Sequence, residues 1–189
     1  MFANDYINYY STNRQYAPYL DNDEFLSCLP ASFKLDKIEN KMIDFIEQEQ
    51  LFNTRLWKLF TEQFKAGNVD DENLGWRGEY WGKMMRGACI TYKYTQNSKL
   101  YEILNNTVND LLDTQDELGR FSTYSVGNEY KGWDLWSRKY ILLGLLHFHE
   151  ICKSEELKER IVTALKAHLD YIINGIGRGE GKIPVGETS

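Results

Sequence analysis

The second half of the sequence repeats itself with a period of about 57 residues, and this repeat constrains the fold more than any other feature. The shift aligns Trp76 with Trp133 and Leu104 with Ile161. Each repeat has the periodicity of two helices separated by a short break. The first helix is apolar on nearly all sides and the second is amphipathic, as expected for one buried and one surface helix. This alternation predicts an all-α fold, an incomplete (α/α) toroid of helical hairpins.

Start and stop signals set the expected bounds of these helices. Ser154 is suited to cap a helix, because its hydroxyl can accept a hydrogen bond from a backbone N–H of the first turn. Gly175, which follows Asn174, is a typical stop signal. The predicted helices cover residues 79–95, 99–115, 135–152 and 155–173.

Residues 35–67 also have helical periodicity, but the residues before them do not. We expect one further helix pair after the start of the chain, with Asp36 as a candidate N-cap and Gly67 as a stop. Residues 1–34 contain two prolines and show no sustained period. The sequence therefore predicts an irregular N-terminal arm over residues 1–34 and one helical domain over residues 35–189.

Composition excludes several classes of protein. The 189 residues carry a net charge of −6, which gives no general attraction for a phosphate backbone, so we expect no nucleic-acid partner. No uncharged apolar run reaches the roughly 18 residues that a membrane span needs, so we expect no membrane partner. The first ten residues show no secretory signal and the three cysteines form no Cys-x-x-Cys pair, which predicts a cytoplasmic protein with reduced thiols.

Two short segments combine aromatic and charged residues in a chain that is 14% aromatic. They are residues 75–83, Gly-Trp-Arg-Gly-Glu-Tyr-Trp-Gly-Lys, and residues 132–140, Gly-Trp-Asp-Leu-Trp-Ser-Arg-Lys-Tyr. Each segment lies at the start of a helix that we expect to be buried, so we expect both segments at the same end of the toroid. Aromatic rings beside carboxylates and arginine are typical of sugar-binding sites. Alternatively, the rings fill the core and the charges pair with one another.

These segments resemble glycoside hydrolase family 127, the β-L-arabinofuranosidase-like enzymes, as does the stretch Gln-Asp-Glu-Leu-Gly-Arg-Phe-Ser-Thr at residues 115–123. The resemblance covers roughly residues 35–185 and implies an (α/α)6 barrel that acts on arabinofuranosyl-type linkages. Better-known branches of the family carry a histidine where this chain has Tyr140, so their exact substrate is not carried over. The resemblance also implies a zinc-bound cysteine nucleophile, with Glu and Cys zinc ligands in the second half of the barrel.

Nothing in this chain matches those zinc ligands, and six repeats of this size would need about 340 residues. We therefore interpret the chain as the N-terminal half of the catalytic domain, with no cofactor of its own and with zinc expected in a longer parent protein. The half alone is expected to be inactive and to supply substrate-binding residues. A carbohydrate is the expected partner, and the apolar face that an incomplete toroid exposes predicts a homo-oligomer.

Five residues of the two segments are the candidate substrate contacts, and none is assigned a catalytic or metal-binding role. Tryptophan rings would stack on sugar faces and charged groups would bind hydroxyls. The candidates are Glu79, Trp81, Trp133, Asp134 and Arg138. Two other functions fit the pattern: a non-catalytic helical sugar-binding or scaffold module, and an α/α-toroid enzyme such as a sugar epimerase. The epimerase would need a catalytic histidine pair, for which His147, His149 and His168 are poorly placed.

Overall fold

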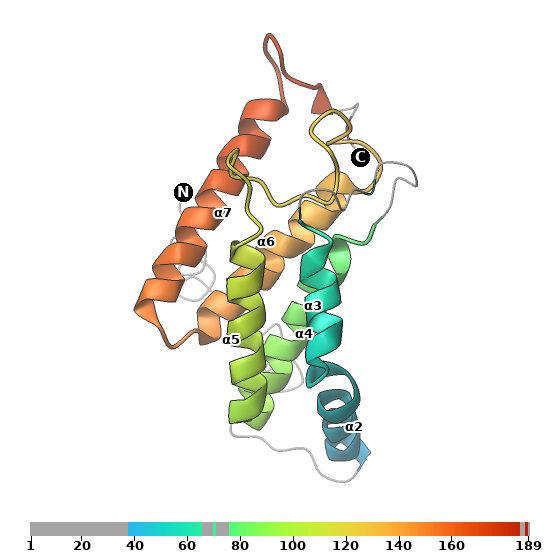
Figure 1. Ribbon diagram of the computed structural model, residues 1–189, viewed down its shortest axis with the longest axis vertical. Helices are drawn as coiled ribbons and strands as arrows, with labels where there is room; N and C mark the ends of the chain where they lie inside the picture. The colour runs from blue at the N-terminus through green and yellow to red at the C-terminus, as the bar shows by residue number, and fades with distance from the viewer. Residues whose placement is uncertain (1–37, 66–69, 71–75, 186–187, 189) are drawn as a thin grey trace, which may run out of the picture. The chain divides into compact units, whose positions relative to one another are not determined.

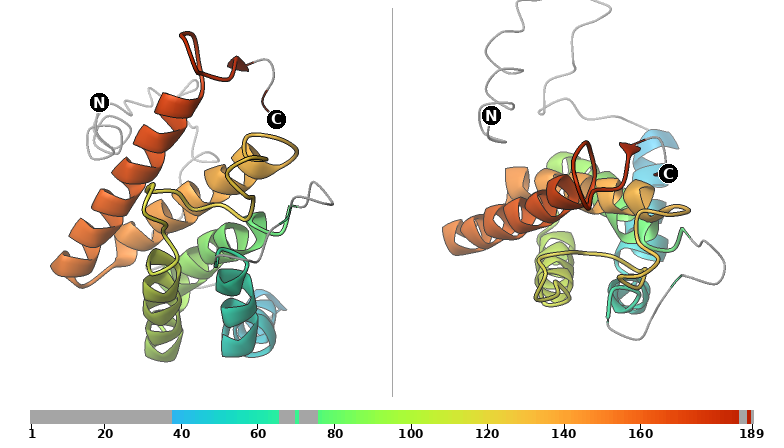
Figure 2. Two further views of the ribbon diagram at one scale, coloured as in Figure 1. Left: turned by 45° about the horizontal axis from the view of Figure 1, so that its top comes forward. Right: turned by 90° about the horizontal axis from the view of Figure 1, so that it is seen from above.

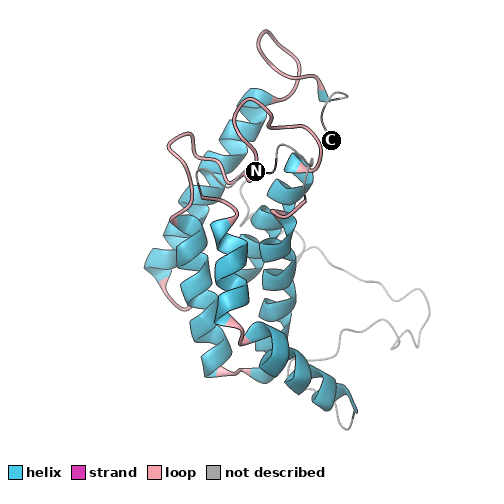
Figure 3. Ribbon diagram, turned by 45° about the vertical axis from the view of Figure 1, so that its right-hand side comes forward, coloured by secondary structure: helices cyan, strands magenta, loops and turns pink. Residues whose placement is uncertain are grey.

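The computed structural model describes residues 38–65, 70, 76–185 and 188. The chain divides into the units Met1–Phe33 and Lys34–Ser189, and all described residues belong to the second. The predicted arm over residues 1–34, the cap at Asp36 and the stop at Gly67 lie outside the described residues. The described part is all-α, as predicted, and holds no strand beyond an isolated bridge between Ile176 and Ile183 (Figure 3).

The helices predicted from the repeat are all present, with bounds within a few residues of those expected. Ser154 caps the last one as predicted, because its Oγ accepts a hydrogen bond from the backbone N–H of Leu157 at 3.2 Å. The elements in chain order (Figure 1) are α2 (Ile38–Ile46), the π-helical turn η2 (Glu47–Leu51), α3 (Thr54–Glu62), α4 (Glu79–Thr95), α5 (Ser98–Leu112), α6 (Asp134–Ile151) and α7 (Glu155–Gly175).

The earlier helix pair is short and is joined through η2. Asn53 caps α3, since its Oδ1 accepts a hydrogen bond from the backbone N–H of Leu56 at 3.1 Å. Glu47 of η2 is buried and accepts hydrogen bonds from Thr95 Oγ1 at 2.7 Å and from Asn97 Nδ2 at 3.0 Å. These bonds fix the turn between α2 and α3 to the connection between α4 and α5.

The first helices of the two repeats, α4 and α6, lie side by side in the middle of the helical unit (Figure 1 and Figure 2). Trp136 donates a hydrogen bond to Glu79, and Lys93 pairs with Glu150. Both contacts join residues 57 positions apart, near opposite ends of the two helices. The repeat in the sequence is therefore a repeat in space, with α4 and α6 running in the same direction.

Glycines allow α4 and α6 to approach closely. A Cβ atom at Gly82 would lie 2.0 Å from the backbone oxygen of Tyr140, and one at Gly144 would lie 3.0 Å from the Cα of Gly82. The two backbones therefore touch with no side chain between them. Gly87, also in α4, takes no part in this contact, because a Cβ there would meet no atom within 4 Å.

The second helices of the two repeats, α5 and α7, cover this pair with one apolar stripe each. On α5 the stripe includes Leu100, Leu104 and Val108, all with no exposed surface. On α7 it includes Ile161 and Leu165, at the spacing of an amphipathic helix. The connection from α5 to α6 lies at the end of the helical unit where α4 and α6 begin (Figure 1). No helix in the described ranges is both long enough and apolar enough to cross a membrane.

Candidate functional site

A pocket of about 240 Å³ lies where α4 and α6 begin. Its aromatic residues are half-exposed, with 50% of the surface of Trp76, 47% of Trp133 and 37% of Trp136 accessible to solvent. The other two tryptophans of the chain, Trp57 and Trp81, are buried. The lining residues, which we call the tryptophan pocket, are Trp76, Glu79, Lys83, Trp133 and Trp136.

The aromatic rings of the tryptophan pocket are held by contacts to one another and to polar groups. Trp133 and Trp136 meet edge to face, with ring centres 6.0 Å apart, and Trp136 meets Tyr140 in the same way at 5.3 Å. The indole N–H of Trp76 donates a hydrogen bond to the hydroxyl of Tyr80 at 2.7 Å. Edge-to-face pairs fix ring orientation. The rings therefore present defined faces to solvent.

Glu79 is the polar group at the base of this pocket, and it is 8% exposed. One carboxylate oxygen accepts a hydrogen bond from the indole N–H of Trp136. The other oxygen lies 2.7 Å from Nζ of Lys83, one helical turn further along α4. A buried carboxylate requires such partners, because its desolvation would otherwise cost several kcal/mol.

The structure brings two of the five predicted contact residues together and places the other three elsewhere. Glu79 and Trp133 both line the tryptophan pocket. Trp81 has no exposed surface, and its indole N–H donates to Thr107 Oγ1 at 3.0 Å inside the helical core. Asp134 and Arg138 are buried as well, with 0% and 1% of their surfaces exposed. Contact of these three residues with a ligand stays a prediction.

Asp134 and Arg138 form a buried network that holds the α5–α6 connection. Arg138 Nε donates to Asp134 Oδ2 at 3.0 Å, and Arg138 Nη2 donates to Glu129 Oε2 at 2.7 Å. Asp134 Oδ2 also accepts the backbone N–H of Tyr130 at 2.8 Å. Tyr130 has a φ of +64°, in the left-handed region, and this hydrogen bond helps to hold it there.

The charges of this network support one another. Burial alone would lower the pKa of the Arg138 guanidinium, but its ion pairs with Asp134 and Glu129 outweigh burial and raise that pKa. Arg120 Nη1 adds a second hydrogen bond to Glu129 Oε2 at 2.9 Å, and the hydroxyl of Tyr171 donates to the other oxygen of Glu129. The network therefore joins the connection to both α6 and α7.

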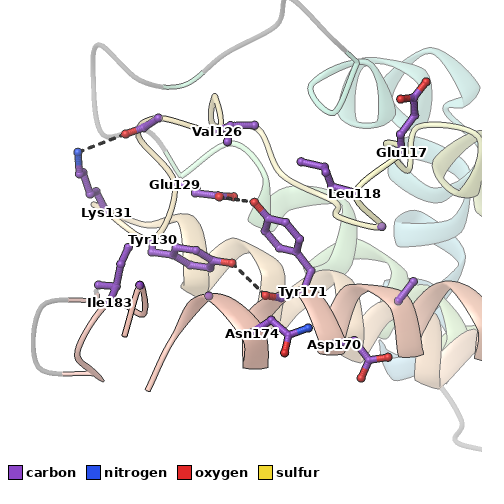
Figure 4. A pocket seen from close by; sticks show the side chains of 15 residues that line it. Glu117, Leu118, Val126, Glu129, Tyr130, Lys131, Asp170, Tyr171, Asn174 and Ile183 are labelled. Carbon is purple, nitrogen blue, oxygen red and sulfur yellow. Dashed lines mark hydrogen bonds between the residues drawn. The ribbon is translucent and has the colours of Figure 1, made fainter. Parts of the chain in front are cut away.

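A second, wider cavity of about 750 Å³ lies between the α5–α6 connection, the end of α7 and the segment that follows it (Figure 4). Its wall includes three acidic residues, Glu117, Glu129 and Asp170. Figure 4 shows Tyr171 directed at Glu129, whose carboxylate is already occupied by the buried network. No pattern in the sequence predicts this cavity.

A comparison of the chain with protein-family models shows which family it belongs to. The family model described as "Beta-L-arabinofuranosidase, GH127 catalytic domain" matches residues 4–187. The chain belongs to the GH127 family. Comparisons with curated proteins and with solved structures found no match.

Membership in GH127 supports glycoside hydrolysis at the level of the family, with a carbohydrate as the class of substrate. It also agrees with the all-α array of helical hairpins, which fits part of an (α/α) toroid. The resemblance drawn from the segments at residues 75–83, 115–123 and 132–140 is thereby confirmed. Self-association stays a prediction.

The GH127 resemblance implies zinc, and the described residues give no test of it. Within residues 38–65, 70, 76–185 and 188, no group of three or more His, Cys, Asp and Glu side chains is arranged to hold a metal ion. Burial raises the pKa of the Cys89 thiol to about 12, which disfavours the thiolate that binds metals. Both expectations stay predictions: no cofactor in this chain, and zinc in a longer parent protein.

Three residues of the tryptophan pocket were not among the predicted contacts: Trp76, Lys83 and Trp136. The repeat contained the signal for two of them. It aligns Trp76 with Trp133, so that both rings fall at the start of their helices, and it aligns Glu79 with Trp136. Lys83 lies four residues after Glu79, which is the spacing of an ion pair along one helix face.

Proposed function

We propose that the tryptophan pocket is the saccharide-binding site of this GH127 domain, and that it takes arabinofuranosyl-type glycans. The observation that supports this most is the clustering of three half-exposed indole rings around a buried carboxylate. Exposed tryptophans cost free energy in water unless a ligand covers them. A sugar ring has an apolar face that stacks on an indole and hydroxyls that bind a carboxylate or an ammonium group.

The position of the pocket supports the same function. It lies at the N-terminal ends of α4 and α6, the two helices that pack together at the centre of the unit. The α5–α6 connection approaches the same end and is held there by the buried network of Asp134 and Arg138. A site on rigid helix ends keeps its rings and charges in place before the ligand arrives, which reduces the entropy cost of binding.

The test is a titration of the intact chain with arabino-oligosaccharides, followed by tryptophan fluorescence and calorimetry. Because three of the five tryptophans line the pocket, we expect a change in emission when the ligand binds. Trp133→Ala should weaken binding about ten-fold or more, since one stacked aromatic ring contributes about 1–3 kcal/mol. Ile90→Ala, which shortens an exposed side chain further along α4, is the matched control and should bind as the parent does.

Two results would count against the proposed function. One is the absence of any binding to arabino-oligosaccharides by a folded chain. The other is equal affinity in the parent and the Trp133→Ala variant, which would place the ligand away from the tryptophan pocket. Far-ultraviolet circular dichroism and thermal unfolding of each variant show whether it is folded.

A further inference from the structure

Next to the tryptophan pocket, α4 and α6 bring three cations to one pair of aromatic rings. Nζ of Lys139 lies 3.4 Å from the centre of the Trp136 ring and 4.4 Å from that of Tyr140. Nζ of Lys83 lies 4.8 Å from the centre of the Tyr140 ring. Cζ of Arg86 lies 6.0 Å from the same ring centre. We call Lys83, Arg86 and Lys139 the cation cluster.

The cation cluster has more positive charges than it has carboxylate partners among the described residues. Lys83 is paired with Glu79, whereas no carboxylate within the described residues lies in ion-pair range of Arg86 or Lys139. The Nε atom of Arg86 is buried and has no hydrogen-bond acceptor among those residues. The whole chain has a net charge of −6, so this local excess runs against the overall charge. All three cations lie beside the Tyr140 ring, and an aromatic ring offsets only part of their charge.

We propose that the saccharide bound by the tryptophan pocket carries a carboxylate group, and that this group binds at the cation cluster. The inference rests on the proposed function and narrows its substrate class to acidic saccharides. An anion bound beside these cations would form charge-assisted hydrogen bonds with them. Arg86 adds a third positive charge beside the same Tyr140 ring.

The geometry allows one ligand to reach both places. Trp136 lines the tryptophan pocket and also touches Tyr140, with ring centres 5.3 Å apart. A sugar ring stacked beside Trp133 and Trp136 therefore lies next to Tyr140, the ring against which the cation cluster lies. The next sugar, or a substituent on the same one, can place its carboxylate against Lys139.

The donors available at the cation cluster favour a carboxylate over a phosphate. Arg86 and Lys139 lie within α4 and α6, past the first turn of each helix, where backbone N–H groups are already used in helical hydrogen bonds. Phosphate sites commonly add free backbone N–H groups at a helix N-terminus. Here only side chains can donate, and a guanidinium with two ammonium groups suffices for the two oxygens of a carboxylate.

The test compares trigalacturonate with its methyl ester, two ligands of the same shape that differ in charge, in titrations of the intact chain. We expect the acid to bind about ten-fold more tightly than the ester at low salt, and the difference to shrink as salt increases. Lys139→Gln and Arg86→Gln should each reduce the ratio of acid to ester affinity about three-fold or more. Lys139 is exposed, so its variant tests the proposal even where Arg86→Gln fails to fold.

The matched control is Lys99→Gln. Lys99 also lies over an aromatic ring, with its Nζ 4.1 Å from the centre of the Phe52 ring, but it belongs to the start of α5 and lines neither cavity. Removal of this charge should leave the ratio of acid to ester affinity unchanged. An equal loss in Lys99→Gln and Lys139→Gln would mean that only the net charge of the chain matters, and would overturn the proposal.

Other outcomes separate this inference from the proposed function. Equal binding of acid and ester, together with normal binding of arabino-oligosaccharides, overturns the carboxylate site and leaves the proposed function in place. If neither galacturonate ligand nor any arabino-oligosaccharide binds, both fail. Inorganic phosphate and free galacturonate are then compared as competitors of trigalacturonate. If phosphate is the stronger competitor, the choice of a carboxylate is overturned.

Discussion

Trp136 donates its indole N–H to the carboxylate of Glu79, and the two residues occupy equivalent positions 57 residues apart in the repeat. The bond joins the first turn of α6 to the first turn of α4. Each repeat therefore supplies one half of the pair at the base of the tryptophan pocket. The aromatic half offers a stacking surface and the acidic half fixes the orientation of that surface.

Substitutions at Glu79 separate these two roles. Glu79→Gln keeps an oxygen that can accept the hydrogen bond from Trp136 but loses the ion pair with Lys83, whereas Glu79→Ala loses both. We expect arabino-oligosaccharide affinity to fall about ten-fold in Glu79→Ala, since a hydrogen bond to a charged group contributes about 1.5–3 kcal/mol, and to fall less in Glu79→Gln. Calorimetric titration measures both. Equal losses in the two variants would show that ring orientation is not what Glu79 provides.

A second prediction concerns the contact between α4 and α6. Gly82→Ala should destabilise the fold by about 3 kcal/mol or more, because its new methyl group would lie 2.0 Å from a backbone oxygen that cannot move alone. Gly87→Ala introduces the same change on the same helix into open space, and should stabilise the fold by about 0.5–1 kcal/mol. Urea unfolding curves measure both free energies. Similar values for the two variants would contradict the packing described here.

These glycines also show what the sequence could and could not predict. The period of 57 residues was enough to predict the helix pairs and the alignment of α4 with α6, since period and polarity reflect which helix is buried. It could not tell which glycine faces the neighbouring helix. Gly82 and Gly87 both lie in α4, five residues apart, and only the packed structure shows which of them faces α6.

The same limit applies to the candidate site. Trp76 and Trp81 are five residues apart and chemically identical, yet one is half-exposed and the other has no exposed surface. Asp134 and Arg138 have the spacing of a helical ion pair, which the sequence shows, but their third partner Glu129 comes from the preceding connection. Loop conformation decides that contact, and no periodicity describes it. The sequence therefore does not tell that Asp134 and Arg138 face the protein interior.

A third prediction addresses the buried network. Asp134→Ala removes one of the two carboxylate partners of Arg138 in the protein interior, and removal of one member of a buried ion pair costs about 3–5 kcal/mol. Asp134→Asn keeps the shape and should cost less. Unfolding in urea at constant pH measures the two effects. Loss of saccharide affinity in Asp134→Asn without loss of stability would instead assign Asp134 the ligand contact that the sequence suggested.

A fourth prediction concerns cysteine and metal. The Cys89 thiol is buried and its pKa is raised to about 12, so we expect it to react with a thiol reagent at pH 8 only as fast as the fold opens. We also expect the 189-residue chain to bind no stoichiometric zinc and to release no arabinose from aryl arabinofuranosides. Metal analysis after incubation with zinc, and a chromogenic assay, check these points. One zinc ion per chain, or measurable hydrolysis, would contradict them.

The last prediction follows from His168, which has no exposed surface and accepts the backbone N–H of Phe121 at its Nδ1, 3.0 Å away. Burial, with the nearby charges of Arg138 and Arg120, lowers the pKa of its imidazole to about 3. The unfolded chain therefore binds a proton at this residue below about pH 6.5, where the folded chain does not.

The contribution of His168 should consequently lower the free energy of unfolding by up to about 1.4 kcal/mol per pH unit as the pH decreases from about 6.5 toward 3. Above pH 7, His168 should add nothing to the pH dependence of stability. His168→Asn keeps an oxygen near the position of Nδ1 and has no group that titrates in this range, so its free energy of unfolding should change less between pH 7 and pH 5. Burial also lowers the pKa values of His147 and His149, and both remain in the variant as an internal reference. Urea unfolding of parent and variant at several pH values measures the difference in slope. Parallel profiles would show that His168 takes up its proton in the folded state, in conflict with its burial beside two arginines.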